Sequence, residues 1–173
     1  MLQIRKGVFE TNSSSVHTIC ISTNDYITDS MRDSIEMYKE YGMPCVLGEF
    51  GWDEDTVSYN TSRLSYLYTA ITQLNDCYKN NDNYNKYSWN YVTDVFDELG
   101  IELHYDNSNE WYGIDHVTET IEFLDYIYED KCHLISFIFN DDSCVYTGND
   151  NEENYTDEKD IDTSNLILFC KGN

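Results

Sequence analysis

The chain has little of what marks linker-rich, membrane-spanning or secreted proteins. Its 173 residues include one proline and eight glycines, so no Pro- or Gly-rich linker divides it, and we expect a single domain over residues 1–173. No apolar run approaches the roughly 20 residues that a membrane-spanning helix needs, and the N-terminal segment lacks the apolar stretch of a signal peptide. We therefore expect a cytoplasmic protein that does not bind membranes. If the chain acts inside a host cell, we expect it in the cytoplasm of that cell.

Paired cysteines are also missing. The six cysteines are scattered singly, with no CxxC pair and no histidine at zinc spacing. In a cytoplasmic protein such cysteines are typically reduced thiols, and we expect most of them to be buried. The sequence therefore predicts no structural metal site and no cofactor.

Basic residues are scarce. The chain has 10 Lys and Arg against 33 Asp and Glu, which gives a net charge of −23 and a pI of about 4.1. Such a surface repels nucleic acids and membranes and attracts basic partners, so we expect no sequence-specific DNA binding. The segment 140–163 is the most acidic part, and within it we expect residues 149–163 to form an acidic mobile loop.

The hydrophobic pattern predicts a folded protein of the α+β class. Hydrophobic residues make up 40% of the chain and aromatic residues 15%, which argues against disorder. We expect one mixed, mainly antiparallel sheet with about four helices packed against it. The expected helices span 25–41, 61–78, 92–99 and 117–130, and the expected strands span 2–9, 16–22, 46–52, 101–105, 133–140, 143–147 and 165–170.

Two of these elements carry specific expectations. The apolar segment HLISFIFN at 133–140 is expected to be a central strand that pairs with 143–147. On the helix expected at 61–78, the tyrosines are expected to be core residues whose phenolic tips reach water; they are Tyr66, Tyr68 and Tyr78.

The N-terminal segment KGVFETNSSSVH, residues 6–17, combines hydroxyl, amide and charged side chains. A serine nucleophile requires a base within hydrogen-bond reach, and His17 follows Ser15 by two residues. Asn, Ser and Thr side chains also stabilise turns through bonds to their own backbone, and we favour a hairpin turn between the strands at 2–9 and 16–22.

Three further polar motifs accompany this segment. They are GEFGW at 48–52, IDH at 114–116 and SCVYTGNDN at 143–151. With the N-terminal pattern GxFETNSSSxH, they make the chain resemble a group of uncharacterised small proteins of phages and mobile elements of Gram-positive bacteria. Some small phage-borne proteins that look like this act as anti-CRISPR inhibitors of Cas9, so the resemblance implies an inhibitor of this kind.

Charge and resemblance together predict an acidic inhibitor of a basic, nucleic-acid-handling host defence enzyme. Cas9 or its guide-RNA complex is the best single candidate, because it holds nucleic acid in channels lined by Arg and Lys. Carboxylates would replace phosphates there, and the acidic surface on the helix at 92–99 comprises Asp94, Asp97 and Glu98. The candidate binding residues are Asn12, Ser13, Ser14, Ser15, Trp52, Asp53, Glu54, Asp55, Asp115, Thr147 and Asn149.

An alternative is a phosphodiester hydrolase or nuclease, for example one that acts on guide RNA. Histidine and carboxylate side chains supply acid–base groups, and a divalent metal is possible under this alternative. The candidate catalytic residues are Glu10, His17, His116 and Asp150. This hypothesis requires the separated motifs to meet in the folded chain. A structural or regulatory phage protein is a third possibility, and the sequence does not predict the oligomeric state.

Overall fold

The computed structural model describes residues 15–23, 27–51, 55–79, 86–106, 108, 111–149 and 164–171. The strand expected at 2–9, the turn expected before Ser15 and the acidic segment 150–163 lie outside the described residues.

The main sheet has four antiparallel strands in the order β4-β7-β1-β8. These strands are β4 (Asp55–Val57), β7 (Cys144–Asn149), β1 (Ser15–Ser22) and β8 (Leu166–Lys171). Strand β1 lies between β7 and β8, with Ile19 opposite both Val145 and Phe169. Residues 17–22 of β1 are all buried, as expected for a central strand covered on both faces.

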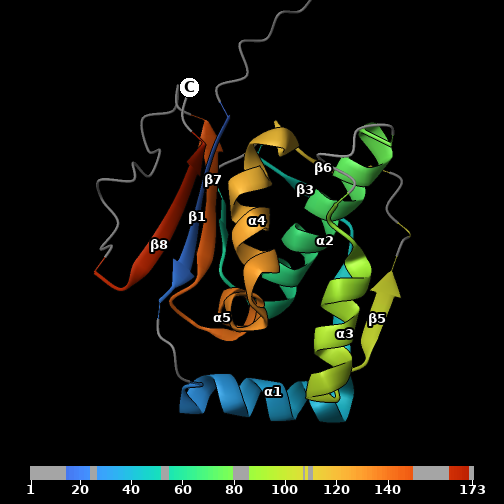
Figure 1. Ribbon diagram of the computed structural model, residues 1–173, viewed down its shortest axis with the longest axis vertical. Coiled ribbons are helices and arrows are strands. Elements are labelled where there is room, and N and C mark those ends of the chain that lie inside the picture. The colour runs from blue at the N-terminus through green and yellow to red at the C-terminus, as the bar shows by residue number, and fades with distance from the viewer. Residues whose placement is uncertain are drawn as a thin grey trace, which may run out of the picture.

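The helices are α1 (Asp29–Tyr41), α2 (Asn60–Cys77), α3 (Trp89–Leu99), α4 (Ile121–Glu129) and α5 (Lys131–Phe139), with a short 3₁₀ helix η1 (Val117–Thr120) before α4. Helices α2 to α5 lie to one side of this sheet, and α1 crosses the lower end of the molecule (Figure 1). Helix α5 packs against β1 and against α2, and α2 also contacts η1 and α3. Helix α2 therefore lies at the centre of the molecule, and the helix expected at 61–78 is confirmed.

Two short parallel strand pairs complete the fold. Strand β2 (Met43–Val46) pairs with β5 (Leu103–Asp106), and β3 (Glu49–Phe50) pairs with β6 (Gly113–Ile114). Parallel strands need a long crossover between them, and here the crossovers contain α2 and α3. The α+β class is confirmed, with the strands divided among one antiparallel sheet and these two pairs.

The strand expected at 133–140 is wrong, because this segment forms helix α5. Asp130 caps the helix by accepting a hydrogen bond from the Cys132 backbone N–H at 2.8 Å. The helix is apolar on all sides and its last four residues are buried, so it shows no amphipathic period. The strand expected at 143–147 is present as β7, but it pairs with β1 and β4.

One cation lies inside the core. Arg63 of α2 is fully buried, and its guanidinium donates hydrogen bonds to the backbone carbonyls of Ile138 and Asn140, both at 2.8 Å, and of Ser143. The carbonyls at the end of a helix have no partner within the helix. Arg63 therefore closes the C-terminal end of α5.

No helix in the described part of the chain is long and apolar enough to span a membrane.

Candidate functional site

The end of the N-terminal motif lies beside the TGN motif. In the β1–β7 register, His17 is opposite Thr147 and Ser15 is opposite Asn149. The next strand continues the same row, since Asp55 of β4 is opposite Thr147. Asp55, Thr147 and His17, which come from distant parts of the sequence, therefore lie side by side across the main sheet.

The GEFGW and IDH motifs are also neighbours. Phe50 of β3 is opposite Ile114 of β6, and the backbone N–H of Asp115 donates to the Phe50 carbonyl at 3.1 Å. The side chain of Gln73 on α2 accepts from the Ile114 N–H at 2.6 Å and donates to the Ile114 carbonyl at 3.2 Å. Helix α2 therefore holds the IDH motif in place.

These two motif pairs meet at His17. Gly51 has a φ of +104°, and a Cβ atom on it would lie 2.3 Å from His17 Nε2 and 3.4 Å from Asp115 Cβ. A side chain at position 51 is therefore excluded by the imidazole as well as by the backbone conformation. We call His17, Gly51, Asp115, His116 and Glu119 the motif cluster; all but Gly51 line one small cavity.

His17 is held by a tyrosine of α2. It is 3% exposed, and its Nδ1 lies 3.2 Å from the hydroxyl of Tyr66, which is fully buried. Burial raises the pKa of Tyr66 well above its usual range, so the phenol stays neutral and can either donate to the imidazole or accept from it. The expectation that the phenolic tip of Tyr66 reaches water is therefore wrong.

His116 lies between two carboxylates. Its Nδ1 is 3.2 Å from Glu119 and its Nε2 is 3.7 Å from Asp115. His116 has a φ of +54°, the one positive value at a non-glycine residue in the described part of the chain. Backbone strain at a polar residue is frequent at functional sites. The imidazole side chain is 40% exposed, so it can exchange a proton with a ligand.

The cluster is closely packed. Its cavity has a volume of about 10 Å³, which is the space of about one water molecule. No group of three His, Cys, Asp or Glu side chains among the residues that the structure describes is placed to hold a metal ion. The motif cluster therefore provides acid–base groups around a space too small for a substrate.

The candidate site residues divide into three groups. The cluster contains His17, Asp115 and His116, while Thr147 and Asp55 follow along the sheet, Thr147 buried and Asp55 exposed. Ser15 and Asn149 are described by their backbone alone. The remaining candidates lie outside the described residues; they are Glu10, Asn12, Ser13, Ser14, Trp52, Asp53, Glu54 and Asp150.

Sequence reasoning missed two polar members of the arrangement. Glu119 follows His116 by three residues, a spacing that places side chains together on one helical turn, so the sequence contained a signal for it. Tyr66 lies 49 residues from its partner His17, and no local pattern connects the two.

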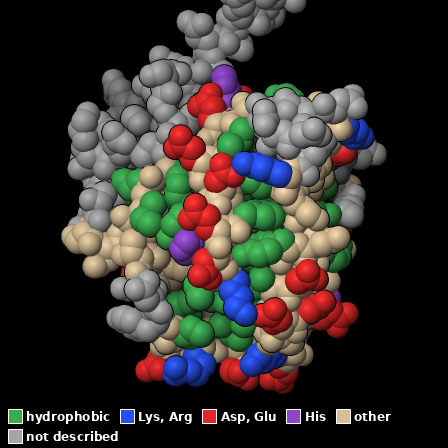
Figure 2. All heavy atoms as spheres, viewed as in Figure 1, with side chains coloured by type: hydrophobic (Ala, Val, Ile, Leu, Met, Phe, Trp, Pro, Cys, Tyr) green, Lys and Arg blue, Asp and Glu red, His purple; other side chains and the backbone are tan. Residues whose placement is uncertain are grey.

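The exposed cations that the structure describes are all engaged by carboxylates of the chain itself. Each Lys or Arg whose exposed side chain the structure describes forms an ion pair with a carboxylate. The pairs are Arg32 with Asp29, Lys39 with Glu36, Lys79 with Asp76, Lys86 with Asp125, and Lys131 with Glu98. Figure 2 shows carboxylates dispersed over one face of the molecule, among hydrophobic side chains and a smaller number of Lys and Arg side chains. The carboxylates left over from these pairs set the sign of the surface potential.

No protein-family model, no curated protein and no solved structure matches this chain, so its own residues and surface are the basis for a functional proposal.

Proposed function

We propose that this protein is a phage-encoded inhibitor that binds a basic, nucleic-acid-handling host defence enzyme in the host cytoplasm, with Cas9 as the best single target. The observation that carries the proposal is the acidic surface. The net charge is −23, and the exposed cations in the described part are already paired with carboxylates. The four phage-like motifs support the same source and target.

The mechanism in this proposal is competition with nucleic acid. Cas9 holds its guide–target duplex in a positively charged channel and reads its short recognition sequence with arginines. Carboxylates of the inhibitor occupy the positions of phosphates, and they gain affinity from the same electrostatic attraction that favours DNA. Binding should therefore weaken with salt, as it does for nucleic acid.

The test is a binding titration with Cas9, with and without guide RNA, between about 50 and about 200 mM salt. We expect measurable affinity at the low end and a steep decrease with salt. A second basic protein that does not handle nucleic acid serves as the specificity control. Absence of binding to both forms of Cas9 at low salt would remove Cas9 as the target, and equal binding to the control protein would show that charge alone is responsible.

The motif cluster supports a second candidate function, hydrolysis of a phosphodiester such as guide RNA. The observation in its favour is that His17 of β1 lies beside Asp115 and His116 of the distant IDH motif, with His116 in a left-handed backbone conformation that is uncommon for a non-glycine residue. His116 would act as the acid or base, positioned by Asp115 and Glu119. The described residues do not supply three ligands for a divalent metal, so no step is assigned to one.

This candidate is tested by incubating the protein with guide RNA, with and without a chelator, and analysing the RNA on a gel. The His116→Gln variant should lose the activity. The His104→Gln variant is the matched control, because His104 is an exposed histidine of β5 that does not line the cluster. Cleavage that persists in the His116→Gln variant would exclude the role given to His116.

A further inference from the structure

Two buried cysteines lie directly opposite each other in the main sheet. In the β1–β7 register Cys20 is the partner of Cys144, and the two strands lie side by side in Figure 1. Both residues are reduced thiols, and they are 0% and 8% exposed. Side chains of directly opposite residues in an antiparallel pair lie on the same face of the sheet. We call these two residues the β1–β7 thiol pair.

The register gives the thiol pair the spacing that a disulfide requires. Directly opposite residues of an antiparallel pair have Cα atoms about 4.5 to about 5.5 Å apart. A disulfide joins residues whose Cα atoms are about 4.4 to about 6.8 Å apart. The Cys20 thiol already donates a hydrogen bond to the Cys144 sulfur. The two sulfur atoms can therefore bond to each other with little movement of either strand.

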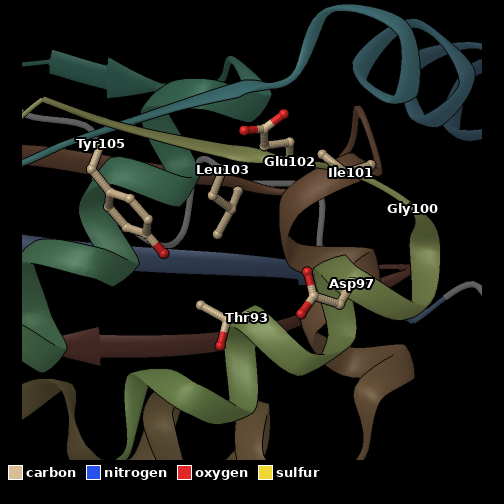
Figure 3. Close-up of a pocket in the computed structure, with 7 residues that line it drawn as sticks. All are labelled: Thr93, Asp97, Gly100, Ile101, Glu102, Leu103 and Tyr105. Atoms are coloured by element: carbon tan, nitrogen blue, oxygen red, sulfur yellow. The ribbon is translucent and has the colours of Figure 1, made fainter.

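The other cysteines on described strands have no cysteine opposite them. Cys45 of β2 is opposite Tyr105 of β5, the residue whose ring is labelled in Figure 3. Cys170 of β8 is opposite Thr18 of β1. The thiol pair is therefore the one place in the registers of the described strands where a cysteine is paired with a cysteine.

The surroundings of Cys144 favour its thiolate. The hydrogen bond from Cys20 has the largest effect, and the hydroxyl of Tyr146, two residues further along β7 and therefore on the same face, donates a second bond. The guanidinium of Arg63 donates to the carbonyl of the preceding residue and adds a positive charge. Together these groups outweigh burial and the charge of Asp142, and they lower the pKa of Cys144 from 9 to about 7. The thiolate is the form of cysteine that reacts with oxidants.

We infer that the β1–β7 thiol pair is an oxidation site, which a peroxide converts into a disulfide. Cys144 is the more exposed member and reacts first. Its thiolate attacks one oxygen of hydrogen peroxide, the O–O bond breaks, the sulfur becomes a sulfenic acid, and the other oxygen leaves as hydroxide and takes up a proton. Cys20 then attacks this sulfur, so that the S–S bond forms, the S–O bond breaks and water leaves. Two thiols and one peroxide thus give one disulfide and two water molecules.

The disulfide would join the two strands that carry motif residues. Further along the same register, His17 of β1 is opposite Thr147 of β7. Oxidation therefore fixes the position of β1 that the motif cluster requires, and a dithiol reductant releases it. Disulfides of cytoplasmic proteins are typically transient and redox-sensing. The inference goes beyond the proposed function, because it concerns the chain itself and does not depend on a target.

The first experiment treats the reduced, native protein with hydrogen peroxide at low protein concentration. The remaining thiols are then blocked in denaturant, and the chain is digested without reduction for peptide mass spectrometry. We expect a cross-linked pair of peptides that contains Cys20 and Cys144 and is lighter by two hydrogen atoms than the reduced peptides, while Cys45 stays reduced. Absence of this pair, or a disulfide from either residue to Cys170, overturns the inference.

Three variants test the order of the steps. The Cys144→Ser variant should form no disulfide at Cys20, and the Cys20→Ser variant should keep a sulfenic acid on Cys144, where dimedone traps it. The matched control is Cys132→Ser, which should form as much disulfide as the wild type, because Cys132 lies on α5 and outside the sheet. Sulfenic acid on Cys20 of the Cys144→Ser variant would overturn the order given above. If a variant does not fold, the peptide pair of the wild type decides.

The last measurement is thermal unfolding of the oxidised and reduced wild type. A disulfide between residues far apart in the chain stabilises mainly by restricting the unfolded state, so oxidation should raise the Tm by about 5 to about 15 °C. A dithiol reductant should reverse the rise, and the Cys144→Ser variant should show none. A disulfide that leaves the Tm unchanged or lowers it overturns the inference, since the bond would then not fit the native register.

Discussion

Replacing Arg63 with methionine should destabilise the protein by about 1 kcal/mol. The guanidinium donates to three buried backbone carbonyls around the end of α5. The Asn140 carbonyl also accepts from the Ser143 backbone N–H at 3.0 Å, so the substitution leaves two carbonyls without a donor, at a cost of about 2 kcal/mol each and about 4 kcal/mol together. Burial lowers the pKa of Arg63 from 12.5 to about 10. That shift corresponds to about 3 kcal/mol of desolvation cost, which methionine relieves. The carbonyl term is larger, so the net effect is a loss of stability.

The measurement is urea unfolding followed by circular dichroism, together with thermal unfolding. A net loss of about 1 kcal/mol should lower the Tm by about 2 to 4 °C in a chain of this size. The control is Arg32→Met, because the guanidinium of Arg32 is 60% exposed and pairs with Asp29 one helical turn away, a type of contact worth under about 0.5 kcal/mol. Equal stability of the Arg63→Met variant and the wild type would refute the reasoning, since it would mean that the carbonyls need no cationic donor.

Three further outcomes follow from other parts of the structure. Gly51→Ala should lower the free energy of unfolding by at least about 3 kcal/mol, and Gly100→Ala by about 1 kcal/mol. Both positions have a positive φ, but only a Cβ atom at position 51 would collide with His17. Equal losses for the two variants in urea unfolding would argue against the collision. Burial raises the pKa of Tyr87 from 10 to about 12, so the stability that this neutral phenol contributes is present below pH 10 and is lost as the pH rises from 10 to 12. Unfolding measured across this interval, with tyrosinate absorbance as the monitor, should show the decrease. A flat profile in the wild type and in the Tyr87→Phe variant alike would contradict this expectation. Burial also raises the pKa of the Cys45 thiol to about 12, whereas Cys132 is exposed. Brief alkylation of the native protein, followed by peptide mass spectrometry, should therefore label Cys132 first. Comparable early labelling of the two thiols would contradict the burial of Cys45.

The sequence predicted most helices because their apolar residues recur on one face. Helix α2 matches the helix expected at 61–78 to within a residue at each end, and α3 and α4 lie where their periodicity indicates. Helix α5 was mistaken for a strand because it is apolar on every side, and a short apolar run does not distinguish a buried helix from a buried strand. The capping Asp130 before it was the available signal.

The candidate site was predictable only as a set of motifs. Nothing in the sequence indicates that His17 is a neighbour of Asp115 and His116, because this proximity depends on the parallel β3–β6 pair and on the position of β1 in the sheet. Parallel pairs join segments that are far apart in the sequence, so local patterns do not reveal them. The ring of Tyr66 and the absence of a side chain at Gly51 likewise acquire their roles only in three dimensions.

The position of β1 determines when the motif cluster can form during synthesis. Strand β1 is made first among the described elements, but its two neighbours, β7 and β8, begin at Cys144 and Leu166. Contacts between residues so distant in the chain form slowly, since the intervening chain must first be ordered. On the ribosome, β1, which is buried in the folded protein, therefore remains without its sheet partners until β7 and β8 have been synthesised. A polypeptide that stops before β7 contains three of the four motifs but lacks the strand that places His17 in its sheet.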